Sequence, residues 1–423
     1  MRQLTTNATP YGGPQNPRIT DDGSLVVYDD GVNVQLVTTD GRNRPALTNV
    51  SHGTCTQPRP SASGDQVVMI CTADMTGTGH DTDGNGEVVL LNLLNPTPIT
   101  SSPASFFNGD ASISADGRTI VFTSNANYVG GNAAGNDALF LWHDDQLQLI
   151  AGGSGDCAYP TISADGQRIL FKQSAPDGPG NDNNGFWPIQ LYDIGSGRMS
   201  QVVSVESYDP QLSRDGQWVL FRSYADLAGS NPNGTGQLFA ERVGGSVRQL
   251  TQIADRQTYF DFASNADASR IAAMLSRYDP SPPYTQSSEG LLFTSAGVGS
   301  LPGVPIDAQS LSFDAAGRLL AFISSQDPVR QNPQHVPQVF VAVIPLEVET
   351  PSPTSTPTPG SSMCVGDCDG SQAVTVDEIL TMVNIALGNT DVSSCGAGDG
   401  NDDGSVTVDE IISAMNHALN GCS

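Results

Sequence analysis

A short pattern of polar and apolar positions recurs seven times in roughly the first 350 residues of the chain. Each copy has a short strand-like segment, a turn around Asp-Gly, and a second segment in which apolar and polar residues alternate. Alternation predicts a half-buried β-strand, and Asp-Gly between two such segments predicts a hairpin, because a tight turn needs a positive φ. The copies begin at Pro17, Pro58, Ala111, Pro160, Pro210, Phe260 and Leu311.

A third alternating segment follows each hairpin, and a fourth often follows it, as at Leu147 and Val247. Four strands in units of about 40 to 50 residues are typical of a β-propeller, whose blades bury their faces against one another. The last copy has only three clear strands, but RQLTT at Arg2–Thr6 matches the fourth-strand sequence at Arg248–Thr251. We therefore predict a mainly β fold with a seven-bladed propeller, with six or eight blades as alternatives. The N-terminal strand would close the ring.

The last sixty residues contain a second repeat of a different kind. VTVDEILTMVNIAL (Val374–Leu387) and VTVDEIISAMNHAL (Val406–Leu419) each follow a run rich in Asp, Asn and Gly. The run Asp399–Glu410 fits the calcium-loop pattern D-x-[DN]-x-[DN]-G-x5-E, in which oxygen ligands wrap one hard cation. We predict helices after both loops, with Ile379, Val383 and Leu387 on one apolar face and Ile411, Met415 and Leu419 on the other.

Both loops are predicted to bind calcium, the second more tightly. The first loop has Gln372 in place of the turn glycine and Ser371 in place of a carboxylate or amide. The alternative is a solvated acidic turn before an amphipathic helix. The predicted ligands are Asp367, Asp369, Ser371, the Ala373 carbonyl, Thr375 and Glu378 in the first loop, and Asp399, Asn401, Asp403, the Ser405 carbonyl, Thr407 and Glu410 in the second.

A linker separates the two repeats. ETPSPTSTPTPGSS, from Glu349 to Ser362, is rich in Pro, Thr and Ser and predicts an extended spacer without a core. The predicted organisation is a propeller at 1–348, a linker at 349–362 and a calcium-loop domain at 363–423.

Composition narrows the classes of partner. The net charge is −27, and Lys172 is the only lysine, so nucleic acid and anionic membrane surfaces would repel the chain. No apolar run is long enough to span a membrane. We expect a monomer in the extracellular space, cell envelope or periplasm. No signal peptide is visible, and we expect the export signal to lie upstream of the presented start.

Seven cysteines support an oxidising compartment. Four of them, Cys364, Cys368, Cys395 and Cys422, fall in the small C-terminal domain, where disulfides would supplement a marginal core. Their spacing does not match a zinc template, and three connectivities stay open. Cys55 and Cys71 would form a further pair across adjacent strands and leave Cys157 single, or all three would be buried free thiols.

No catalytic motif stands out, so we leave enzymatic activity uncertain and favour a binding protein. G-x-S-x-G and H-E-x-x-H are absent, and the five histidines are scattered. The acidic run Asp81–Glu87 offers a further calcium site with Asp81, Asp83 and Asn85 as ligands, but a solvated turn explains it better.

Two resemblances follow from these motifs. Ser114-Ala-Asp-Gly, Ser163-Ala-Asp-Gly and Ser213-Arg-Asp-Gly resemble the turn of the TolB-type, WD-like propeller repeat. The paired loop–helix repeats resemble dockerin domains or, more loosely, an EF-hand pair, although dockerins usually end the loop with Asp and lack the four cysteines. The resemblances imply a propeller that binds a protein or glycan and a calcium-dependent module that docks to a cohesin-like or surface partner. The alternative is a polysaccharide-degrading glycosidase or lyase recruited by its tail.

Overall fold

The computed structural model describes two compact units, Met1–Leu346 and Glu347–Ser423. The described residues are 1–6, 13–76, 83–92, 95–103, 105–153, 155–174, 187–253, 258–279, 285–345, 364–371, 373–400 and 404–421. The predicted linker at 349–362 lies outside them. Each unit is treated by itself below.

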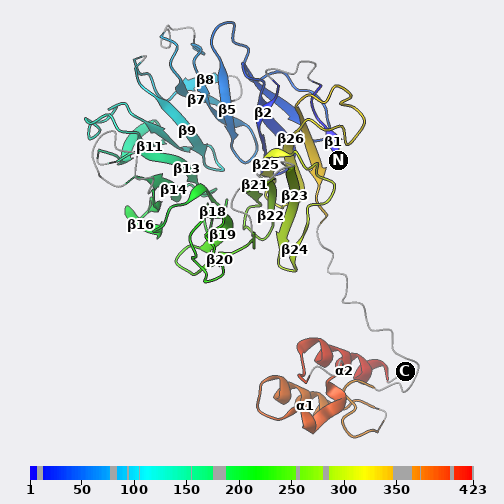
Figure 1. The fold of residues 1–423 in the computed structure, drawn as a ribbon. Coiled ribbons are helices and arrows are strands. Elements are labelled where there is room, and N and C mark those ends of the chain that lie inside the picture. The colour runs from blue at the N-terminus through cyan, green and yellow to red at the C-terminus, as the bar shows by residue number, and fades with distance from the viewer. Residues whose placement is uncertain are drawn as a thin grey trace. The chain divides into compact units, whose positions relative to one another are not determined.

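The first unit is a seven-bladed β-propeller. Its strands form seven antiparallel sheets that follow one another around a ring (Figure 1). Blade 1 contains β2 (Gln15–Ile19), β3 (Leu25–Asp29) and β4 (Val34–Thr38), and blade 2 contains β5 (Cys55–Pro60), β6 (Gln66–Cys71), β7 (Glu87–Asn92) and β8 (Asn95–Pro98). Blade 3 contains β9 (Asn108–Ile113), β10 (Thr119–Ser124), β11 (Ala138–His143) and β12 (Gln146–Ala151). Blade 4 contains β13 (Cys157–Ile162), β14 (Arg168–Gln173), β15 (Ile189–Asp193) and β16 (Arg198–Val203). Blade 5 contains β17 (Tyr208–Leu212), β18 (Trp218–Ser223), β19 (Gln237–Arg242) and β20 (Val247–Gln249). Blade 6 contains β21 (Thr258–Ser264), β22 (Ile271–Asp279), β23 (Thr285–Thr294) and β24 (Gly297–Ser300). Blade 7 contains β25 (Gln309–Phe313), β26 (Leu319–Ser324), β27 (Gln338–Val343) and the N-terminal strand β1 (Arg2–Gln3).

The Ser-x-Asp-Gly sequence builds the turn between the first two strands of a blade. The Ser114 hydroxyl donates to Asp116 Oδ1 at 2.6 Å and accepts from the Thr119 N–H at 3.0 Å. Gly117 has a φ of 75°, which a residue without a Cβ adopts at little cost. Local side-chain chemistry therefore fixes the hairpin, as predicted.

Packing between blades makes the hydrophobic core. One cluster joins Val68 and Leu90 of blade 2 to Ile113, Phe122 and Phe140 of blade 3. The rings of Phe122 and Phe140 stack with centroids 5.6 Å apart. Since each blade buries apolar surface against its neighbours, an open row of blades would leave two faces in water.

The N-terminal strand closes the ring, as predicted. β1 pairs with β27, with Arg2 opposite Val341 and Gln3 opposite Phe340. The Thr5 hydroxyl accepts from the Val339 N–H at 2.9 Å and donates to Gln338 Oε1 at 2.7 Å. This joins the two ends of the propeller chain within one blade.

Blade 5 repeats this arrangement without a break in the chain. Its Thr251 hydroxyl accepts from the Leu238 N–H at 2.9 Å and donates to Gln237 Oε1 at 2.7 Å. The shared RQLT sequence thus marks equivalent positions in blades 5 and 7.

The second unit is small and contains α1 (Val376–Ala386), the 3₁₀ helix η2 (Val392–Gly398) and α2 (Val408–Asn420). Its core contains Val374, Met382, Ile385, Val406 and Ala414. No helix in the described part of the chain is long and apolar enough to cross a membrane.

Disulfides occur in both units. Cys55 pairs with Cys71 across β5 and β6, and Cys157 is a buried free thiol, as the first of the two alternatives predicted. Cys368 pairs with Cys395 in the second unit, where Cys364 is also disulfide-bonded.

Candidate functional sites

The first predicted calcium loop gathers three carboxylates. One oxygen atom from each of Asp367, Asp369 and Glu378 lies within 4.8 Å of the others. Asp367 Oδ1 and Asp369 Oδ1 both accept from the Ser371 N–H at 2.9 Å. Hydrogen bonds from Ser371 hold the pKa of Asp369 below its usual value, so this carboxylate is ionised at neutral pH. These are hard oxygen ligands of the kind that calcium takes.

The glutamate at the last loop position ties the loop to its helix. Glu378 Oε1 accepts from the Cys368 N–H at 2.8 Å, and Oε2 accepts from the Thr375 N–H at 2.7 Å. The Thr375 hydroxyl also donates to Oε2, at 2.9 Å. The buried carboxylate thus holds both ends of the loop.

The second loop repeats these contacts residue for residue. Glu410 Oε1 accepts from the Gly400 N–H at 2.8 Å, and Oε2 accepts from the Thr407 N–H at 2.8 Å and the Thr407 hydroxyl at 3.0 Å. Asp399 Oδ2 accepts from the Gly404 N–H at 2.7 Å, and Gly404 has a φ of 87°. Asn401 and Asp403 lie outside the described residues, as does Gln372 of the first loop.

The predicted apolar faces of the two helices are only partly correct. Ile379, Val383 and Ile411 are partly buried, but Leu387, Met415 and Leu419 are exposed. Met382, Ile385 and Ala414 occupy the core instead. The error arises because each helix is apolar on more than one side, and periodicity alone does not say which side faces the core.

The exposed apolar residues occupy equivalent positions in the two helices. They form two stripes: Val376, Leu380 and Leu387 on α1, and Val408, Ile412, Met415 and Leu419 on α2. Within each stripe, successive members lie on one helical face. The second unit therefore presents two similar apolar surfaces to solvent.

The acidic run at Asp81, Asp83 and Asn85, for which we favour a solvated turn over a calcium site, includes Asp81, which lies outside the described residues. The Asn85 amide nitrogen donates to Ser102 Oγ at 2.9 Å and to the Pro103 carbonyl at 3.3 Å. This binds the Asn85 side chain to the next loop.

The propeller has a central cavity of about 390 Å³. It is lined by the first strand of every blade. Sequence analysis did not identify this site, because its residues are far apart in the chain.

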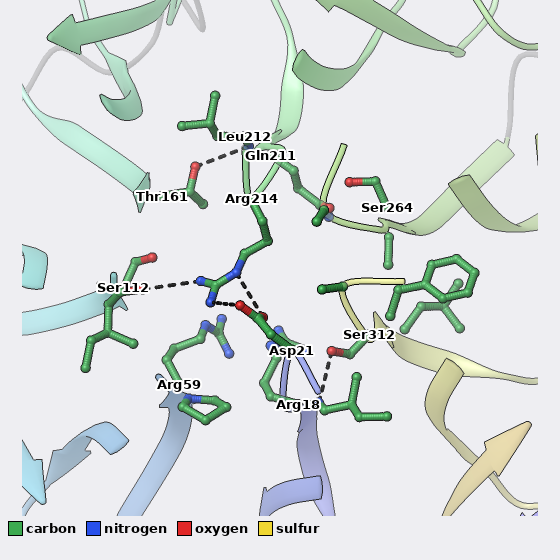
Figure 2. Close-up of a pocket in the computed structure, with 18 of the residues that line it drawn as sticks. Arg18, Asp21, Arg59, Ser112, Thr161, Gln211, Leu212, Arg214, Ser264 and Ser312 are labelled. Atoms are coloured by element: carbon green, nitrogen blue, oxygen red, sulfur yellow. Dashed lines mark hydrogen bonds and ion pairs between the residues drawn. The ribbon is translucent and has the colours of Figure 1, made fainter. Parts of the chain in front are cut away.

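One end of the cavity is bounded by the Ser-x-Asp-Gly turns. The second residue of each turn takes part in a ring of backbone hydrogen bonds, as where the Asp21 N–H donates to the Ala62 carbonyl at 3.0 Å. Five blades have alanine at this position, but blades 1 and 5 have Asp21 and Arg214. Arg214 donates from Nε to Asp21 Oδ1 at 3.1 Å and from Nη2 to Oδ2 at 2.7 Å. This bidentate ion pair joins blade 1 to blade 5 inside the cavity (Figure 2).

The middle of the cavity is lined by another set of equivalent residues. In three blades a short polar side chain here bonds the next blade, as where the Ile162 N–H donates to Ser112 Oγ at 3.3 Å and the Leu212 N–H donates to Thr161 Oγ1 at 3.3 Å. The complete set is Arg18, Arg59, Ser112, Thr161, Gln211, Ala263 and Ser312. Blades 1 and 2 thus place arginines where other blades have small or uncharged residues, and Figure 2 shows both in the cavity.

Burial affects the two arginines strongly. Burial and the neighbouring Arg18 lower the pKa of Arg59 to about 9, against the attraction of Asp110 and Asp29. Burial also lowers the pKa of Arg18, against Asp261 and Asp29. Both guanidinium groups remain cationic at neutral pH, so two like charges face one cavity.

The strand-start end of the cavity is built from β-bulges. Asp110, Tyr159 and Asp209 occupy equivalent positions on β9, β13 and β17 with φ of 52°, 53° and 52°. Such φ values are uncommon for residues other than glycine, and bulges of this kind re-aim side chains near functional sites. Asn16, Gln57 and Ser310 have similar φ values at the equivalent positions, so the bulge is a feature of the blade repeat. We call this end of the cavity, where the inner strands begin, its mouth.

Aromatic and cationic side chains continue outward from the mouth. The Asp209 carboxylate lies 3.4 Å from Arg222 Nε, and the Arg222 guanidinium lies 4.7 Å from the Tyr208 ring centroid. Lys172 Nζ lies 5.4 Å from the same ring and donates to the Ser207 carbonyl at 2.6 Å. Burial lowers the pKa of this lysine. Flat rings and fixed cations of this kind suit a polar or anionic ligand.

No protein-family model and no curated protein matches the sequence. Solved structures do match the propeller. An oligogalacturonate lyase in complex with manganese has 15% identity and a TM-score of 0.57 over 81% of this chain and 92% of that one. The β-propeller domain of the trilobed protease from Pyrococcus furiosus has 11% identity and a TM-score of 0.52 over 78% and 94%. TolB from Acinetobacter baumannii has 18% identity and a TM-score of 0.36 over 69% and 62%.

The first two matches confirm the fold, but identities this low say nothing of activity. Manganese in the first structure raises the question of a metal in this propeller. The cavity lining contains four aspartates but no histidine or cysteine. Among the described residues, only the Asp367, Asp369 and Glu378 cluster of the second unit brings three metal-binding side chains together. In the described part of the cavity, no three of these carboxylates come close enough together to form such a cluster.

Proposed function

We propose that this chain is an exported binding protein with two parts, in which the propeller binds a protein or glycan and the C-terminal unit docks to a partner when calcium is bound. The observation that carries the proposal is the repeated loop architecture, in which Glu378 and Glu410 hold equivalent loops in the same way. The clustered carboxylates of the first loop and the matching contacts of the second favour calcium over a solvated turn.

Calcium would act through the fold of the small unit. The ion would replace hydrogen bonds inside each loop, neutralise its carboxylates and fix the start of the following helix. The exposed stripes on α1 and α2 would then be held in the orientation that a partner contacts. A cohesin-like or cell-surface partner fits such a calcium-dependent surface.

Calcium titration of the full chain tests this proposal. We expect two equivalents to bind by calorimetry, and Glu410→Gln to weaken the second site about tenfold or more, because it loses a charged ligand. Glu378→Gln should do the same at the first site. Asp409→Asn, one position earlier on the exposed side of α2, is the matched control and should change neither affinity. Wild-type affinity in Glu410→Gln would refute the ligand assignment.

The second candidate is a polysaccharide-degrading enzyme of the lyase or glycosidase type. The similarity of the propeller to an oligogalacturonate lyase favours it, together with carboxylates at the cavity mouth. Incubation of the chain with polygalacturonate, monitored for unsaturated products and reducing ends, separates the two proposals. Turnover that Asp209→Asn abolishes would replace the binding role with a catalytic one.

A further inference from the structure

Arg18 and Arg59 are the clearest departure from the repeat that no structural role accounts for. At the equivalent position, Ser112, Thr161 and Ser312 accept a hydrogen bond from the next blade. The arginines instead extend into the cavity, where Figure 2 shows them on the strands of two adjacent blades. Packing alone does not require two cations here, because small residues line the same layer elsewhere.

Neither arginine forms an ion pair within the described residues. Arg18 Nη1 donates to the carbonyl of its own neighbour Pro17 at 2.9 Å, and Arg59 Nη1 donates to that of Pro58 at 3.4 Å. Most of their donors therefore remain available to a ligand.

The nearby carboxylates are engaged with the backbone. Asp29 Oδ2 accepts from the Gln57 N–H at 3.2 Å, and Asp110 Oδ2 accepts from the Tyr159 N–H at 3.4 Å. Asp261 Oδ2 accepts from the Ser310 N–H. Each acid thus supports the bulged residue of the following blade, and its charge also attracts Arg18 or Arg59.

The cavity suits a small polar anion. Its volume of about 390 Å³ lies within the range of small-molecule sites. Guanidinium groups bind carboxylates through two parallel hydrogen bonds, and the Gln211 and Ser264 side chains in the same cavity can meet hydroxyl groups (Figure 2). Tyr159, 54% exposed, offers an aromatic ring at the mouth. The net charge of −27 disfavours a long polyanion, which leaves a short ligand whose carboxylate enters the cavity.

We propose that the propeller cavity binds a uronate residue of a short acidic saccharide, with its carboxylate held between Arg18 and Arg59. The inference rests on the proposed role of the propeller as a glycan-binding platform and names the ligand class. Since the Arg214–Asp21 ion pair occupies the turn end, the saccharide enters from the end where the inner strands begin.

Calorimetric titration of the full chain with digalacturonate tests the proposal. We expect binding, at least tenfold weaker binding of its dimethyl ester, which lacks the charge, and no comparable binding of inorganic phosphate. Arg59→Gln should weaken digalacturonate about 10- to 100-fold, because it removes charged hydrogen bonds. The affinity of Arg59→Lys should lie between those of the wild type and Arg59→Gln, because lysine keeps the positive charge but not the planar guanidinium with its paired donors. Arg198→Gln on exposed β16 is the matched control and should bind like the wild type.

Thermal unfolding without ligand separates a binding role from a structural one. Arg59→Gln removes repulsion from Arg18, so we expect an unchanged or higher Tm. A lower Tm with unchanged digalacturonate affinity would make Arg59 structural and overturn the proposal, as would preference for phosphate or no binding of digalacturonate. Equal binding of the dimethyl ester would overturn the uronate assignment but leave the propeller as a glycan platform. Calcium titration of the same variants reports separately on the C-terminal unit.

Discussion

The two units of this protein hold their folds together in opposite ways. The propeller is stabilised by contacts between residues far apart in sequence, because each blade packs on the next and Thr5 bonds to Gln338 and Val339 to close the ring. The C-terminal unit depends on contacts within a short segment, such as those of Glu378 with its own loop, and on disulfides. A large ring can lose one interaction and remain folded, whereas a small unit with a marginal core depends on each of its links.

Disulfide removal should show this difference most strongly. Cys55–Cys71 and Cys368–Cys395 close loops of 16 and 27 residues, so their loss costs a similar amount, about 3 to 3.5 kcal/mol by loop entropy. We expect the C368S/C395S variant to unfold the C-terminal unit and the C55S/C71S variant to keep the propeller folded. Limited proteolysis of the full chain with mass mapping of the fragments distinguishes them. Equal resistance of both variants would contradict the comparison.

Closure of the ring can be tested with a matched pair of substitutions. Thr5→Val and Thr251→Val each remove a buried hydroxyl with two equivalent partners in its own blade, so each should lower the free energy of unfolding by about 1–3 kcal/mol. Only Thr5→Val loosens the strand that closes the ring. Hydrogen exchange at Leu4, whose N–H donates to the Val339 carbonyl, should therefore rise in Thr5→Val and stay unchanged in Thr251→Val. Similar exchange in both would mean that the closing strand is held by other contacts.

A smaller effect is expected at a blade turn, where the structure is local even within the propeller. Partial burial raises the pKa of Asp116, but hydrogen bonds from Ser114 and the Arg118 N–H lower it more, so the net pKa is below its usual value. A depressed pKa adds stability above the unfolded value near 4, and this stability is lost as the pH falls through the folded value. Ser114→Ala should raise the pKa of Asp116 in a carboxyl NMR titration. An unchanged pKa would show that Ser114 does not hold the carboxylate.

Local sequence signals predicted most of the architecture. The Asp-Gly turns predicted the hairpins because a positive φ and a Ser–Asp hydrogen bond depend only on neighbouring residues. The RQLT sequence at Arg2 predicted the closing strand because the same sequence forms the fourth strand that ends near Thr251. The acidic loops were located by spacing, since one short segment contains every predicted ligand of a loop.

Other features were not accessible from local pattern. The helix faces were partly misassigned, because tertiary packing decides that Met382, Ile385 and Ala414 lie in the core. The sequence indicates the cavity arginines only weakly. When the seven blades are aligned, Arg18 and Arg59 stand where the other blades have serine, threonine, glutamine or alanine. Without the ring, nothing shows that this position faces a cavity.

The sequence by itself determined the blade repeat, the closing strand, the second repeat and its acidic loops, because each depends on residues close together in the chain or on copies of one motif. Only the tertiary structure decided that Asp21 pairs with Arg214, that Arg18 and Arg59 share a cavity, and which helical faces stay exposed. These depend on which distant segments meet, and ring closure fixes that only when all seven blades pack together.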